Sequence, residues 1–369
     1  MKRKIIILHE YGAKDHYTAL FHLQKKGLLD ISEREFNLSS SLKKFIKKRT
    51  SFEFKRFLMN FFWLSKSFIF PISNKNITII LGIAPFDWKL ILIKRITKYS
   101  NVVLHTSWTS WNDNFHPRKN IFLSSRIKSL WRNYILNCVS GVAAVTPTVK
   151  NEIIKFCENS LVEKKIEIVY HAIHDISDIQ RIKKNDNLTV LFVGNIIEQK
   201  GINKIITISE LNEDVMFKFI GKGKLSDSIE KSKSKNIEYL GYINNKKELY
   251  KNYVTADVII LPSLRRGKWE ELFGIALAEA MYHGCVPLVT NHPGPATILS
   301  GSFLTKNIFT EDDFIDDASK EIKKMKGDPS YLSNLKREAN MCASSFTAEN
   351  ISKAWMKLIE IEVGNVKDL

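Results

Sequence analysis

Short apolar runs rich in β-branched residues alternate along this chain with amphipathic stretches, and this alternation constrains the fold more than any other feature. In the first half, residues 5–8, 77–81, 102–104, 141–145 and 166–170 are typical of strands, and 16–26 and 124–137 of helices. In the second half, strand-like runs recur at 189–193, 217–220, 237–240, 258–261 and 286–290. Strands buried on both faces and separated by helices form parallel, doubly wound sheets. We therefore predict an α/β fold.

The chain is long enough for two domains. Its 369 residues exceed what one hydrophobic core usually holds. The polar, charged stretch 175–187 separates the two series of strands and is typical of a linker. We expect an N-terminal domain at 1–178 and a C-terminal domain at 179–346, followed by a helical segment within 347–369.

Composition favours a cytoplasmic protein. No apolar run reaches the roughly 20 residues that a membrane span needs, and the run that follows the basic start at Met1 is too short for a signal peptide. Four cysteines, Cys138, Cys157, Cys285 and Cys342, show no metal-ligand spacing. We expect them to be reduced thiols.

The net charge of +17 is unevenly distributed. Residues 41–70 hold eight Lys or Arg and one acid, Glu53, among many aromatic residues, in what we predict to be basic amphipathic helices. Such helices suit an anionic membrane surface. An ordinary core-facing helix with a solvated basic face is the second interpretation, and nucleic-acid binding the third. We favour the membrane surface and expect no nucleic-acid partner.

Two carboxylates, Glu271 and Glu279, lie eight positions apart around Phe273-Gly274-Ile275. They follow a strand-like run that ends at Ser263, so we expect a helix to begin near Gly274. A helix N-terminus offers unpaired N–H groups to phosphate, and carboxylates accept hydrogen bonds from sugar hydroxyls. The combination favours a nucleotide-sugar site. The alternative is an amphipathic helix with an acidic cap and a solvated Glu279.

The run 271–281 resembles the Glu-x-Phe-Gly and Glu-Ala-Met motif of the family-4 glycosyltransferases, which are retaining enzymes of the GT-B fold. The resemblance continues through 282–290 and 294–298. It extends back through 191–201, 219–223 and 240–242, and it covers about 188–298. It implies two Rossmann-like, doubly wound domains that face each other across a cleft, with the C-terminal helix returning to the first domain.

The resemblance also implies an activity. A hexose-type sugar would pass from a UDP- or GDP-sugar to a saccharide or lipid-linked acceptor, in bacterial surface polysaccharide or glycolipid synthesis. The acceptor would attack from the face that the nucleoside diphosphate leaves, so no protein nucleophile is required. The enzyme would work without a cofactor or metal, at the inner face of the cytoplasmic membrane. The pairs Asp312-Asp313 and Asp316-Asp317 would be a solvated helix face.

Three residues would carry the catalysis. Lys200 would contact the donor diphosphate, Glu271 would lie beside the donor, and His105, at a strand exit, would bond the donor hexose and orient the acceptor. Asn195 occupies the position of the family's usual Arg and brings no charge, so Arg265 and Arg266 are candidates to compensate. The donor-binding residues would be Gly12, Asn195, Gly241, Tyr242, Phe273, Gly274, Ile275 and Glu279.

Trp108, Trp111 and His116 follow His105 and include residue types that stack on sugars. They are acceptor-site candidates, or else part of a buried structural loop.

Two other functions remain open beside glycosyl transfer. A GT-B nucleotide-sugar epimerase would use the same crevice, and a sugar-nucleotide-binding protein without turnover fits the Asn195 exchange. A nucleotide-dependent dehydrogenase is disfavoured, since no Gly-x-Gly-x-x-Gly follows the first strand.

Overall fold

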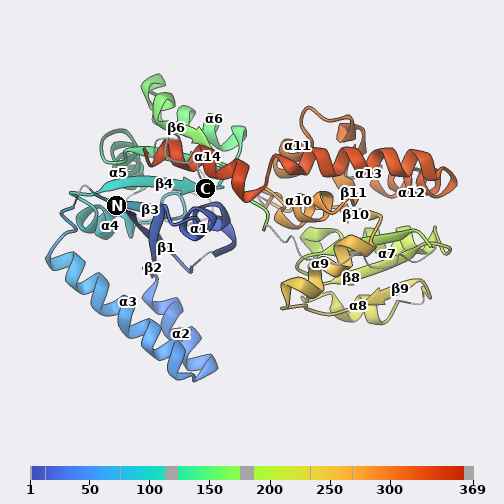
Figure 1. The fold of residues 1–369 in the computed structure, drawn as a ribbon. Helices are drawn as coiled ribbons and strands as arrows, with labels where there is room; N and C mark the ends of the chain where they lie inside the picture. Colours follow the sequence, from blue (N-terminus) through green and yellow to red (C-terminus); the bar gives the residue numbers. More distant parts are fainter. Residues whose placement is uncertain are drawn as a thin grey trace. The chain divides into compact units, whose positions relative to one another are not determined.

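The computed structural model describes residues 2–12, 14–74, 76–112, 124–174, 187–232, 234–267 and 269–360. The chain divides into two compact units, Met1–Ala172 with Ala348–Leu369, and Ile173–Thr347 (Figure 1). The expected domain boundary at 178 and nearly all of the expected linker lie outside the described residues.

The first unit contains a six-stranded parallel sheet in the order β2-β1-β3-β4-β5-β6. The strands are β1 (Arg3–His9), β2 (Leu29–Glu35), β3 (Ile77–Gly82), β4 (Asn101–Thr106), β5 (Gly141–Ala144) and β6 (Ile166–Ile168). The helices are η1 (Lys14–Tyr17), α1 (Thr18–Lys25), α2 (Leu38–Lys48), α3 (Ser51–Ile69), α4 (Leu90–Ile96), α5 (Ser124–Asn137), α6 (Pro147–Cys157), η2 (Ser160–Lys165) and α14 (Ala348–Leu358).

The second unit repeats this architecture with the order β12-β11-β10-β7-β8-β9. Its strands are β7 (Thr189–Val193), β8 (Met216–Ile220), β9 (Ile237–Tyr239), β10 (Val258–Leu261), β11 (Val286–Thr290) and β12 (Ile308–Phe309). Its helices are η3 (Glu198–Lys200), α7 (Ile202–Glu210), α8 (Ser226–Glu230), α9 (Lys246–Thr255), α10 (Ile275–Tyr282), α11 (Pro293–Leu299), η4 (Phe303–Asn307), α12 (Phe314–Gly327) and α13 (Pro329–Ser344).

The central strands of the first sheet are buried on both faces, which is why they are mostly apolar. Ile79 and Leu81 belong to one hydrophobic cluster, and Ile80, between them, belongs to another. Successive side chains of a strand point to opposite faces, so the two clusters lie on the two sides of the sheet. The second cluster also contains Trp355, through which α14 packs onto this unit. The predicted doubly wound sheets are confirmed.

The sequence pattern missed the edge strand β2. Its sequence, Leu-Asp-Ile-Ser-Glu-Arg-Glu, is largely polar, because β2 pairs only with β1 and is covered less than the central strands. The strand expected at 166–170 ends earlier, at Ile168.

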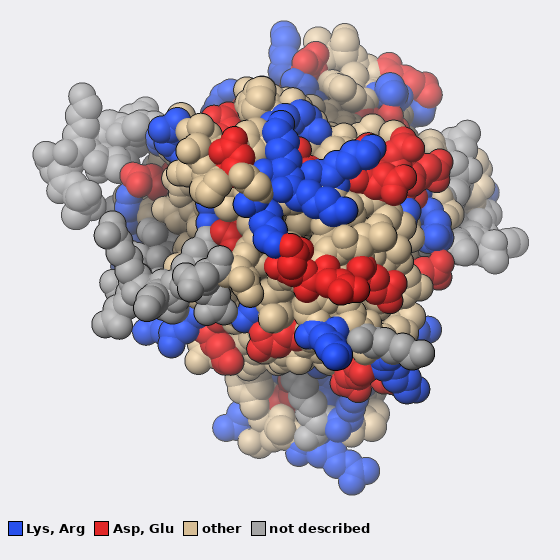
Figure 2. All heavy atoms as spheres, turned by 90° about the vertical axis from the view of Figure 1, so that its right-hand side faces the viewer, with Lys and Arg blue, Asp and Glu red and all other residues tan. Residues whose placement is uncertain are grey.

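Helices α2 and α3 form the predicted basic pair and extend away from the sheet of the first unit (Figure 1). We call this pair the hairpin. Thr50 caps α3 by accepting a hydrogen bond from the Glu53 N–H at 3.3 Å. Phe52, Phe62, Ile69 and Phe70 are each more than 60% exposed. Figure 2 shows the molecule from the right-hand side of Figure 1, and on this face acidic and basic side chains are interspersed.

None of the helices in the described part of the chain has the length and apolar character required to cross a membrane.

Candidate functional site

Lys200 and Glu271 come together at the carboxyl ends of the strands of the second sheet. Lys200 ends η3 after β7, and Glu271 lies in the loop between β10 and α10. The Lys200 ammonium contacts the Glu271 carboxylate, and both side chains are largely buried. The Ser263 hydroxyl donates to the same carboxylate at 3.2 Å. Ligands of open α/β sheets bind at this edge, so the pair lies in the region where such sheets bind their ligands.

Glycines allow the loops at this edge to pack closely. A Cβ on Gly201 would lie 2.0 Å from the Pro262 carbonyl oxygen, and one on Gly221 would lie 1.8 Å from the Gly194 carbonyl oxygen. Gly274 has a φ of +92° and is the residue from which α10 begins. Only glycine adopts such backbone without strain. The predicted helix start near Gly274 is confirmed.

Glu279 is buried in α10 rather than solvated. Its carboxylate accepts hydrogen bonds from Tyr250 at 2.9 Å and from Tyr253 at 3.3 Å, both on α9. Burial raises the pKa of Glu279, against the tyrosine hydroxyls and the charges of His174 and Lys246, which lower it. The structure therefore places a carboxylate with two phenol donors on α10, the helix that follows the Glu271 loop.

Arg265 and Arg266, which we expect to compensate for the missing positive charge at position 195, both pair with carboxylates in this structure. Arg265 pairs with Glu270 at 3.3 Å and Glu311 at 3.5 Å. Arg266 pairs with Glu198 at 3.0 Å. Both guanidinium groups are thus held by carboxylates of neighbouring loops, although each remains nearly half exposed.

The remaining donor candidates differ in exposure. Asn195 is exposed at the exit of β7, and Tyr242 is 60% exposed with the Lys222 ammonium 4.6 Å from its ring centroid. The main chain of Gly241 accepts from the Gly221 N–H at 2.8 Å. Phe273 is buried against Phe346 and Ile275 is half-buried, so these two shape the loop more than they present a surface.

In the first unit, His105 lies at the end of β4 inside a cluster of aromatic side chains. His16, His171, Tyr17 and Trp355 have rings centred 4.9 to 6.4 Å from the His105 ring. Burial, and then the neighbouring imidazoles, lower the pKa of His105 well below its usual value. Burial likewise lowers the pKa of His171. Both rings are therefore neutral near pH 7 and suited to hydrogen bonding rather than to carrying charge.

Gly12 lies beside a buried polar cluster that joins the sheet to the hairpin. A Cβ on Gly12 would lie 2.7 Å from Oε1 of Glu35, the last residue of β2. Arg56 of α3 pairs with this carboxylate, and Lys44 of α2 lies 3.6 Å from it. Lys44 also donates to the main-chain oxygen of Tyr11 at 3.1 Å. Lys44 thus bonds the Gly12 loop to α2, and Arg56 of α3 pairs with the Glu35 carboxylate beside that loop.

The acceptor candidates after His105 fall into different environments. Trp111 is a core residue, 2% exposed and packed with Phe86, Trp131 and Phe156, so the structural-loop interpretation holds for it. Its indole N–H donates to the Trp108 carbonyl at 2.9 Å. Trp108 is half-buried. His116 lies outside the described residues.

The sequence patterns missed Ser263, His171 and His292. Each directly follows a predicted strand or lies within two residues of one, which is the signal that would have found them. No group of three or more His, Cys, Asp or Glu side chains within the described ranges is arranged to hold a metal ion.

Residues 174–341 match the family model for glycosyl transferases group 1. An uncharacterized 41.2 kDa protein in the cps region of Klebsiella pneumoniae is 29% identical over 188 residues, which cover 48% of this chain and 49% of that protein. The capsular polysaccharide biosynthesis glycosyltransferase CapH of Staphylococcus aureus is 28% identical over 145 residues, covering 36% of this chain and 38% of CapH. The chain thus spans about half, or less, of the length of these curated relatives.

The solved structure of Anabaena HepE in complex with UDP matches 98% of this chain and 100% of its own, with a TM-score of 0.63 and 14% identity. This likeness concerns the fold. With two six-stranded parallel sheets in this chain, it shows the GT-B fold. The match to the glycosyl transferases group 1 model lies within the second unit of this GT-B chain.

Proposed function

We propose that this protein is a retaining glycosyltransferase, which moves a hexose-type sugar from a UDP- or GDP-sugar to a saccharide or lipid-linked acceptor. The contact of Lys200 with Glu271, at the carboxyl ends of the strands in a group 1 domain, carries the proposal. The family-4 assignment rests on the Glu271-to-Glu279 motif.

In this proposal the Lys200–Glu271 contact is a resting arrangement. When a donor binds, its diphosphate attracts the Lys200 ammonium, and Glu271 accepts a hydrogen bond from a sugar hydroxyl instead. A cation held close to the leaving diphosphate stabilises the charge that develops in the transition state. A diphosphate oxygen takes the acceptor proton in front-face attack, so no protein nucleophile is needed. Glu279, held by two tyrosines, offers a second acceptor for donor hydroxyls.

The relatives support the substrate classes. HepE was solved in complex with UDP, and CapH is named for capsular polysaccharide biosynthesis. We therefore propose a nucleotide-sugar donor and an acceptor used in bacterial surface polysaccharide or glycolipid synthesis. His105, as a neutral imidazole, would hydrogen-bond the donor hexose and orient the acceptor.

We further propose that the enzyme works as a peripheral protein at the inner face of the cytoplasmic membrane. The hairpin supports this, because exposed Phe52, Phe62 and Phe70 accompany the basic residues of α2 and α3. Lys and Arg near an anionic leaflet each contribute about 1 kcal/mol, and inserted aromatic rings add apolar burial.

Isothermal calorimetry with UDP, GDP and their hexose conjugates tests the donor class, with NAD as the negative control. We expect one nucleoside diphosphate to bind and its sugar conjugate to be consumed in the presence of a chelator, since no metal enters the proposal. NMR of the product would show whether the anomeric configuration is retained. Binding without turnover would favour a sugar-nucleotide-binding protein, a change in the donor sugar's own stereochemistry would favour an epimerase, and no binding would overturn the proposal.

A further inference from the structure

His292 contacts the main chain of Glu271. It is fully buried between β11 and α11. Its Nδ1 lies 3.1 Å from the Glu271 nitrogen, whose N–H donates to it, and its Nε2 lies 2.9 Å from the Ser263 carbonyl oxygen. A backbone N–H can only donate and a carbonyl oxygen can only accept. The two bonds therefore fix His292 as the neutral tautomer with its proton on Nε2.

These bonds form part of a closed ring around Glu271. The Ser263 hydroxyl donates to the Glu271 carboxylate at 3.2 Å, while the Ser263 carbonyl accepts from His292. The Gly294 N–H, two residues beyond His292, donates to the Glu271 carbonyl at 3.0 Å. Main chain and carboxylate of Glu271 are thus held by Ser263 and the 292–294 segment together.

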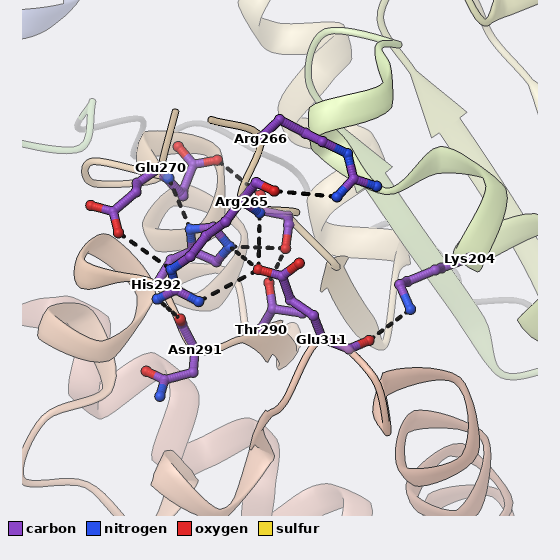
Figure 3. Close-up of polar contacts among 10 residues, drawn as sticks. Lys204, Arg265, Arg266, Glu270, Thr290, Asn291, His292 and Glu311 are labelled. Carbon is purple, nitrogen blue, oxygen red and sulfur yellow. Dashed lines mark hydrogen bonds and ion pairs between the residues drawn. The ribbon is translucent and has the colours of Figure 1, made fainter. Parts of the chain in front are cut away.

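Charged groups surround the imidazole, and Figure 3 shows Arg265, Glu311 and His292 turned toward one another. Glu311 Oε1 accepts a hydrogen bond from the main-chain N–H of Arg265 at 2.9 Å and lies 3.6 Å from His292 Nε2. Burial and Arg265 lower the pKa of His292, while its bond to Ser263 and the carboxylates of Glu311 and Glu271 act in the opposite direction. The net effect is a lowered pKa, which keeps the ring neutral at neutral pH.

We infer that His292 is a positioning residue, which holds the Glu271 segment in the geometry for the donor sugar through its Nδ1 acceptor. The inference rests on the proposed function for the role of Glu271. Protonation would turn Nδ1 into a donor that faces the Glu271 N–H. The two donors cannot bond, so the segment is released and sugar transfer falls on the acid side while the nucleotide remains bound.

Two substitutions separate positioning from mere stability. His292→Asn places an amide oxygen at the same number of bonds from Cα as Nδ1, whereas His292→Ala removes the acceptor. We expect His292→Ala to lower kcat about 30-fold, on the scale of a misplaced catalytic group, with little change in UDP or GDP affinity. His292→Asn should recover most of kcat and lose the acid-side decline that protonation of His292 causes.

Asn307→Ala is the matched control. Asn307 is also buried and donates to the Pro287 carbonyl at 3.0 Å, in β11, the strand that precedes His292. It should lower Tm without altering kcat or the pH profile. If His292→Ala behaves like this control, or if the Ala and Asn variants have equal kcat, the inference is wrong.

NMR of the imidazole nitrogens gives a test that does not require turnover. Wild type should show one histidine as the Nε2–H tautomer whose pKa lies below the ordinary value of an imidazole, and the signal should vanish in His292→Asn. The Glu271 amide should shift when this ring titrates. The inference would be wrong if the His292 ring were protonated at neutral pH, or if the chemical shift of the Glu271 amide did not change as the ring titrates. If wild type bound no nucleotide at all, the proposed function itself would be wrong.

Discussion

Lys200 and Glu271 lie 71 positions apart in the chain, yet the ammonium of one contacts the carboxylate of the other. The contact forms because β7 and β10 are neighbours in the sheet, so the segments that follow them emerge side by side. Charged groups that are mostly buried persist only when they are paired. Each side chain therefore holds the other in place, and in the proposed function a donor would replace this contact.

The first prediction concerns this pair. Lys200→Ala and Glu271→Ala should each lower kcat/KM by about 100-fold or more, because a charge beside the leaving diphosphate or a sugar-binding carboxylate is lost. Lys326→Ala is the control, since Lys326 forms a similar but more exposed pair with Asp214. Steady-state kinetics measures kcat/KM for each variant, once the variant is known to be folded. Near-normal kcat/KM in either variant would refute the assignment.

The second prediction is that Asn195→Arg tightens nucleoside diphosphate binding. The side chain is exposed where β7 ends, so a longer one has room, and a guanidinium binds phosphate better than an amide does. Calorimetry should show a lower Kd. Asn203→Arg, at an exposed position of α7, controls for the added charge. Equal Kd values for both variants would mean that position 195 is remote from the diphosphate.

Patterns of strand and helix predicted most of this fold because its central strands are buried on both faces and therefore apolar throughout. They also predicted the helix start at Gly274, where the backbone needs a positive φ. The polar edge strand β2 carries no such signal. The link between His292 and Glu271 was beyond prediction as well, since it depends on which loops meet at the edge of the sheet, and that follows from strand order.

The third prediction is a loss of stability in acid through His9, whose ring contacts those of His16 and Tyr17. Burial, and then His16 and Lys44, lower the pKa of His9 to about 4 from 6.5. Between these values the unfolded chain binds a proton that the folded chain does not, so stability is full above pH 6.5 and falls as the pH drops toward 4. The loss from His9 is on the order of 3 kcal/mol.

Urea unfolding across this pH range measures the effect. His9→Asn retains an acceptor for the Tyr11 N–H, which donates to His9 Nδ1 at 3.2 Å, but it cannot titrate. Its stability should therefore decline less in acid than that of wild type. Parallel declines for the two proteins would show that His9 does not contribute.

The last prediction concerns the hairpin. Lys43 and Lys47 are exposed on α2, whereas Lys44 is held by Tyr11 and Glu35 and must be left intact. Lys43→Gln with Lys47→Gln should weaken binding to anionic vesicles by about 2 kcal/mol, or about 30-fold. Lys320→Gln with Lys353→Gln removes equal charge from α12 and α14 and should have little effect.

Sedimentation with vesicles at low and high salt is the measurement. Screening over a Debye length of about 8 Å should reduce the difference between wild type and the hairpin variant at higher salt. Phe52→Ser with Phe62→Ser should weaken binding at both salt concentrations, because apolar insertion is not screened. Consumption of the nucleotide-sugar in solution should persist in all these variants, since Lys200 and Glu271 belong to the other unit. If the hairpin and control variants sediment equally with wild type, the hairpin is an ordinary solvated surface and the acceptor is not presented by a membrane.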